Sequence, residues 1–103
     1  MADPMRIRVA LRDGVVNVRI LMSHEMETGQ RKDASGALVP AHYIKSVTAT
    51  HQGRTVLSAQ WGPAVAKDPF LQFQFGGAKV GDSVEITWTD NKGDKRTDSA
   101  KIA

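Results

Sequence analysis

The chain contains short runs in which apolar and polar residues alternate strictly. In the first run, residues 5–12, every second residue is apolar, as is typical of a β-strand with one face in a core. Asp13-Gly14 follows, a dipeptide typical of a two-residue hairpin turn, and residues 16–22 resume the apolar phase. Counting outward from this turn predicts three apolar cross-strand pairs: Leu11 with Val16, Val9 with Val18, and Ile7 with Ile20.

The opposite face of this predicted hairpin sets Arg8 against Arg19. Such a face has two interpretations. It can dock or steer an anionic partner, or it can be a solvated face whose charge prevents edge-to-edge aggregation. We prefer the second interpretation at this stage, because it requires no ligand.

Further alternating runs continue to the end of the chain, separated by turn residues. Residues 40–50 lose a clean phase, which predicts a β-bulge, and residues 55–61, 71–75, 84–88 and 95–102 give the remaining strands. About seven short strands and no helical period predict an all-β, immunoglobulin-like two-sheet sandwich. The expected core residues are Ile7, Val9, Val18, Ile20, Leu71, Phe73, Val84, Ile86 and Trp88.

Length and composition limit the function classes. A chain of 103 residues is expected to form a single domain over residues 1–103. The absence of cysteine excludes disulfides and thiolate chemistry within the chain. A net charge of +3, with the two signs mostly interspersed, does not favour nucleic-acid binding. No run is apolar and long enough to predict a membrane span, and the N-terminal residues resemble no export signal.

The connection over residues 22–42 is long for a domain of this size, and such loops are more often functional than idle. It contains His24 and His42, which could bind a metal ion together with Glu25 or Glu27, but no pair has a suitable spacing with a third ligand in obvious reach. We therefore expect no metal, no cofactor and no catalytic residue. Hydrogen bonds from these histidines to loop backbone are the preferred interpretation.

Two large apolar side chains lie in or beside loops. Met26 is flanked by polar residues, and Trp61 follows the strand that ends near residue 60. Each side chain is expected either to close one end of the core or to be exposed for binding to a partner. For Trp61 we prefer the first role, whereas the sequence leaves Met26 open.

Separated blocks of the sequence carry a family resemblance. They are residues 23–29 (SHEMETG), 31–33 (RKD), 40–42 (PAH), 59–65 (AQWGPAV) and 68–70 (DPF). In this order they resemble the SoxZ family of sulfur-oxidation proteins over nearly the whole chain. Glu25 departs from the pattern, because the family usually has proline between the histidine and the methionine. The departure affects the rigidity of the loop entry.

The resemblance implies a non-catalytic subunit of a SoxYZ heterodimer in bacterial thiosulfate oxidation. The companion SoxY-like subunit would bind sulfur intermediates covalently through its cysteine, and the complex would contact other Sox enzymes transiently. The family further implies a periplasmic complex, exported by means of the partner's signal. The expected partner interface comprises His24, Met26, Glu27, Arg31, Lys32, Trp61 and Val65, with Met26, Arg31, Trp61 and Val65 expected to be exposed. A stand-alone ligand- or metal-binding sandwich remains the alternative.

Overall fold

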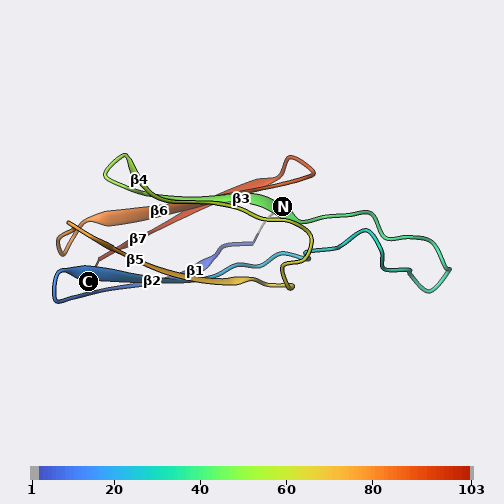
Figure 1. Ribbon diagram of the computed structural model, residues 1–103, viewed down its shortest axis with the longest axis horizontal. Coiled ribbons are helices and arrows are strands. Elements are labelled where there is room, and N and C mark those ends of the chain that lie inside the picture. Colours follow the sequence, from blue (N-terminus) through green and yellow to red (C-terminus); the bar gives the residue numbers. More distant parts are fainter. Residues whose placement is uncertain (1–2, 103) are drawn as a thin grey trace.

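The computed structural model describes residues 3–102 and is all-β (Figure 1). Seven strands form two antiparallel sheets, in the orders β1-β2-β5 and β4-β3-β6-β7. The strands are β1 (Arg6–Arg12), β2 (Val15–Leu21), β3 (Ile44–His51), β4 (Arg54–Gln60), β5 (Phe70–Gly76), β6 (Ser83–Asp90) and β7 (Lys95–Lys101). The prediction of a seven-stranded two-sheet sandwich is confirmed. The single-domain prediction also included residues 1–2 and 103, which lie outside the described residues.

The β1–β2 hairpin has the predicted register, with Ile7, Val9 and Leu11 opposite Ile20, Val18 and Val16. Its turn residues Asp13 and Gly14 both have positive φ, 53° and 77°. This conformation is typical of the two-residue hairpin turn that Asp-Gly predicts. The expected irregularity before Thr50 is also present, because the pairing of β3 with β6 shifts between Ile44 and Ser46.

The core lies between the sheets and follows the period-two pattern. Val18, Ile20, Val84, Ile86 and Trp88 are buried as predicted. Ile7, Val9, Leu71 and Phe73 face the same core but are only partly buried. The difference has a simple cause: β1 and β5 are the edge strands of the three-stranded sheet, and each has a neighbour on one side only. No helix of the described residues is long and apolar enough to cross a membrane.

The β2–β3 connection extends well beyond one end of the sandwich (Figure 1). We call residues 27–42 the arm. Bridges Glu27–His42 and Lys32–Leu38 pair its two sides, and the Val39 N–H donates to the Arg31 carbonyl at 2.7 Å. The arm is therefore an irregular two-stranded hairpin, most of whose residues are exposed.

Glycine is required where the two sides of the arm meet. Gly29 has a φ of 86°, and a Cβ added there would lie 3.1 Å from the Ala41 Cβ. A side chain at this position would be strained in its backbone and crowded against the opposite side. Gly29 therefore permits the close approach of the two sides near the base of the arm.

Candidate functional site

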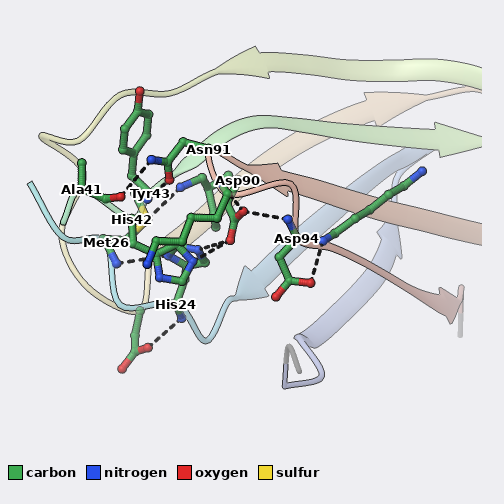
Figure 2. Close-up of polar contacts among 12 residues, drawn as sticks. His24, Met26, Ala41, His42, Tyr43, Asp90, Asn91 and Asp94 are labelled. Atoms are coloured by element: carbon green, nitrogen blue, oxygen red, sulfur yellow. Dashed lines mark hydrogen bonds and ion pairs between the residues drawn. The ribbon is translucent and has the colours of Figure 1, made fainter.

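The arm is attached to the sandwich by a buried carboxylate at the end of β6. Asp90 is 1% exposed, and its Oδ2 lies 3.0 Å from His24 Nε2 and 2.7 Å from His42 Nε2. Its Oδ1 accepts the backbone N–H groups of Lys92 and Asp94 at 3.0 and 2.9 Å. We call His24, His42 and Asp90 the clamp (Figure 2). The clamp joins the segment that enters the arm, through His24, and the outgoing end of the arm, through His42, to the last hairpin.

The hydrogen bonds indicate which nitrogen of His24 carries its proton. The Met26 backbone N–H donates to His24 Nδ1 at 3.1 Å, so this nitrogen is an acceptor. In the neutral ring the proton is then on Nε2, which donates to Asp90. Trp88 packs against the His24 ring in an edge-to-face arrangement, with centroids 5.1 Å apart, and limits its orientation further.

The electrostatics of Asp90 match this arrangement. Burial raises the pKa of the carboxyl, but hydrogen bonds from His24, His42 and two backbone N–H groups outweigh it, so the pKa is lowered from its ordinary value. Asp90 is therefore ionised at neutral pH and acts as an acceptor for all four donors. Four hydrogen bonds offset the cost of burying the charge of this carboxylate.

Asn91 extends the attachment to the outgoing side of the arm (Figure 2). Its Oδ1 accepts the Tyr43 N–H at 2.8 Å, and its Nδ2 donates to the Ala41 carbonyl at 2.9 Å. The Asn91 backbone N–H donates to the Tyr43 carbonyl at 3.0 Å. Residues 41–43 are thus held to the β6–β7 turn by three hydrogen bonds.

Met26 closes the core beneath the arm. Its side chain is 5% exposed, and its sulfur accepts the Ile44 N–H at 3.4 Å. Its backbone has a φ of 51°, a conformation uncommon for residues other than glycine. The expectation that Met26 is exposed is wrong, because burial of its thioether and the bond to His24 hold it inward.

The second loop, residues 61–69, lies at the same end of the sandwich as the base of the arm (Figure 1). The His24 N–H donates to Asp68 Oδ1 at 3.1 Å, and the Asp68 N–H donates to the His24 carbonyl at 3.0 Å. Trp61 and Val65 in this loop are partly buried against the core. Trp61 therefore helps to close the end of the core, as the sequence suggested, and is less exposed than a free anchor.

A metal-binding role is a chemical possibility for the clamp. One ligand atom from each of His24, His42 and Asp90 lies within 4.8 Å of the others. Metal-ligating histidines, however, offer the lone pair of one nitrogen while the other donates its N–H to an acceptor. In His24 the Nδ1 atom already accepts the Met26 backbone N–H, so its Nε2 carries the proton and has no lone pair to offer a metal ion. The clamp as built therefore favours a hydrogen-bonded carboxylate over a metal centre.

A comparison with protein families shows which family the chain belongs to. The family model described as sulphur oxidation protein SoxZ matches residues 5–101. The chain belongs to the SoxZ family. Among curated proteins nothing matches it significantly.

Several solved structures share the fold of this SoxZ-family chain at low sequence identity. Hypothetical protein PH1083 from Pyrococcus horikoshii OT3 is 14% identical at a TM-score of 0.65, covering 99% of this chain and 89% of that one. A superoxide reductase (neelaredoxin) from Archaeoglobus fulgidus is 19% identical at 0.63, covering 96% and 88%. One from Ignicoccus hospitalis is 14% identical at 0.62, covering 98% and 80%. These similarities concern the fold alone.

The predicted interface residues of the SoxZ-family chain differ in exposure, and Glu27, Trp61 and Val65 are partly buried. His24 and Met26 are buried at the base of the arm. Arg31 and Lys32 are exposed on the arm, and Arg31 donates to Glu27 through Nε at 3.0 Å and through Nη2 at 2.7 Å. The hydrogen bond and charge of Arg31 hold the pKa of Glu27 below its ordinary value.

Sequence reasoning missed Asp90 in this SoxZ-family chain. Asp90-Asn91-Lys92-Gly93 is a typical turn sequence, and we interpreted it only as the last hairpin. One signal was available: Asp90 continues the inward phase of Val84, Ile86 and Trp88, and an acidic residue at an inward position needs partners. The two histidines 66 and 48 residues away provide them.

Proposed function

We propose that this SoxZ-family chain is the non-catalytic subunit of a heterodimeric sulfur carrier. Its companion, of the SoxY type, binds the sulfur intermediate covalently on a cysteine. The observation that carries this proposal is membership of a sulfur-oxidation family by a chain that has no cysteine. Without a thiol, covalent sulfur chemistry of the carrier kind has to take place on a partner.

The arm and the second loop are the surface that we assign to the companion subunit. The arm projects from the sandwich and is attached mainly through its base, so its outer part has little of this chain to pack against (Figure 1). It exposes Arg31, Lys32 and Leu38, and Leu38 is 61% exposed. Arginine and large apolar side chains are common anchors of stable interfaces. Trp61 and Val65 continue this surface at the base.

The buried and partly buried residues at the base of the arm take a different role in this proposal. His24 and Met26 position the arm, and Glu27 fixes the Arg31 guanidinium. They act through the arm and not by direct contact with the companion. An arm whose base is fixed loses less entropy on binding, which favours a stable pair.

The proposed complex is periplasmic and is exported by means of the companion's signal. It presents the companion's sulfur-bearing cysteine to the other Sox enzymes in transient contacts. Family membership supports the partnership with a SoxY-like subunit. The periplasmic location is what the family resemblance implies. Fractionation of the native host tests the periplasmic location independently of the contacts with other Sox enzymes.

Intact-mass analysis of the protein purified from its native host tests the central claim. Cells grown on thiosulfate should yield this chain together with a small cysteine-bearing protein, and the companion's mass should include a sulfur adduct that a reductant removes. Recovery of this chain alone, at a concentration where a stable pair persists, contradicts the proposal. An adduct on this chain itself would contradict it as well.

The alternative function is a stand-alone metal-binding sandwich, and the convergence of His24, His42 and Asp90 is the observation in its favour. The His24 tautomer weighs against it, as described above. Elemental analysis of the purified chain, followed by titration with zinc, distinguishes a metal-binding sandwich from a carrier subunit. One equivalent of metal that is lost in His42→Ala would establish the alternative.

A further inference from the structure

We propose that the outer face of the three-stranded sheet is a docking surface for an acidic protein, separate from the arm. We call this surface the arginine face. It comprises Arg6, Arg8, Arg12, Arg19, Leu21 and Phe70 on β1, β2 and β5. This proposal goes beyond the proposed function, because it concerns a different surface and a different contact.

The charge of the arginine face is of one sign. The outward positions of β1, β2 and β5 include four arginines and no aspartate, glutamate or lysine. Over residues 3–102, no carboxylate lies within ion-pair distance of these four guanidinium groups, although Arg31 and Arg96 each have an acidic partner. The positive charge of this face is therefore left for a partner to neutralise.

The position of Arg19 argues against a purely protective role. Arg8 and Arg19 lie directly opposite each other in the β1–β2 register, and like charges at such a pair are destabilising. Charges that prevent aggregation are useful on edge strands, but β2 is the central strand of this sheet. A carboxylate placed between the two guanidinium groups would relieve their repulsion. We therefore take up the docking interpretation of this face, the alternative to the solvated face that was preferred from the sequence.

A hollow of about 330 Å³ lies among the arginines. Arg8, Arg12, Arg19 and Asn17 line it, together with the short side chain of Ala10. Ala10 is paired with Asn17, between the Arg8–Arg19 pair and Arg12. The small side chain leaves depth between longer neighbours, enough for an Asp or Glu side chain to enter. Arginine binds carboxylates through two parallel N–H donors, so the lining matches this ligand.

An apolar pair adjoins the arginines and points to a protein. Leu21 and Phe70 face each other across β2 and β5 and are 42% and 60% exposed. Arg6 lies opposite Leu21 on the other side. Aromatic residues and arginine are enriched at protein interfaces, whereas lysine and the acidic residues are depleted. A nucleic-acid surface would need a denser basic stripe with interleaved aromatic residues, and a second copy of this chain would present the same positive charge.

The experiment uses site-specific photo-crosslinking in the native host. A benzoyl-phenylalanine at Gln74, an outward position of β5 in the register of Asn17, probes the arginine face. The same residue at Ser58, exposed on β4 of the other sheet, is the control. The expected result is one protein adduct at Gln74 and not at Ser58, with the crosslink in an acidic segment of that protein.

Titration of the identified protein with the purified complex then tests the chemistry. The double variant Arg8→Gln/Arg19→Gln should raise the dissociation constant about tenfold or more, and Phe70→Ser should also raise it. The matched control is Lys45→Gln/Arg54→Gln, which removes two exposed charges from the other sheet and should change it less than about twofold. Wild-type affinity should fall steeply between about 0.05 and about 0.5 M salt.

Several results would overturn the proposal. They are an adduct with nucleic acid, an adduct only with another copy of this chain, no protein adduct above the Ser58 level, and equal affinities for the two double variants. An adduct with the companion subunit supports an acidic partner here, but moves the subunit interface from the arm to the sheet. Intact-mass analysis reports pairing by itself, so failure of the arginine face and failure of the proposed function are distinguishable.

Discussion

His24 and Asp90 lie 66 residues apart in the sequence, and their side chains meet at 3.0 Å in the interior. The contact joins the segment that enters the arm to the last hairpin of the other sheet. His42 reaches the same Asp90 oxygen from the outgoing side of the arm. One buried carboxylate therefore determines how a long, exposed segment leaves the sandwich, and the first predictions concern this group.

Asp90→Asn should lower the free energy of unfolding by about 2–3 kcal/mol. An amide offers one acceptor oxygen where the carboxylate accepts four hydrogen bonds, and its own N–H donors then face His24 or His42. Urea denaturation followed by tryptophan fluorescence measures the loss. Asp94→Asn, at an exposed position of the same turn, is the control and should change stability by less than about 0.5 kcal/mol. Equal losses in both variants would show that the buried carboxylate has no special role.

The pH dependence of stability should change with Asp90. Its pKa is lowered in the folded state, so the unfolded chain binds more protons in acid. The stabilisation is complete above the unfolded pKa of about 3.9 and is lost as pH falls through the folded value. Urea midpoints between about pH 6 and about pH 2 should therefore fall less steeply in Asp90→Asn than in wild type. Some acid sensitivity should remain, since the pKa values of Asp82 and Asp98 are lowered too. Parallel curves for the two proteins would argue against this assignment.

Met26→Ala should destabilise the isolated subunit by about 2–4 kcal/mol, because it empties a buried site at the end of the core. Hydrogen exchange should increase at the amides of Met26 and Ile44, whose bonds depend on this loop conformation. Met26→Asp is for the same reason a poor probe of partner binding, because it would disturb the free subunit. An unchanged free energy of unfolding in Met26→Ala would show that the Met26 side chain does not stabilise the core.

The sequence predicted what depends on local pattern and missed what depends on distant contacts. The alternation of residues 5–22 and the Asp-Gly turn determine the first hairpin and its register, and these predictions are confirmed. The depth of burial was not predictable for Ile7 or Phe73, because it depends on which strands become edges of the sheet. The clamp was only partly predicted. His24 and His42 were singled out, but loop backbone was expected as their partner, whereas the Nε2 atoms of both contact the Asp90 carboxylate, which the packing of β6 brings to them.

The last prediction concerns the arm as the proposed contact with the companion subunit. Arg31→Glu and Leu38→Asp should each weaken heterodimer formation by about 2 kcal/mol, some thirtyfold in dissociation constant. Both side chains are exposed, so the circular dichroism of the free subunit should stay unchanged. Its urea midpoint should change only slightly, because Arg31→Glu removes just the surface hydrogen bonds to Glu27. Calorimetry with the purified companion measures the affinity.

Arg54→Glu is the matched control, because it reverses one exposed charge at the β3–β4 turn, away from the arm. It should alter the affinity by less than about 0.5 kcal/mol. Arg8→Glu on the arginine face should change the salt dependence and association rate more than the affinity. Wild-type affinity in both arm variants, with a large loss in Arg8→Glu, would place the subunit interface on the three-stranded sheet. The clamp would then serve the stability of this subunit alone, since its effect on binding depends on the arm.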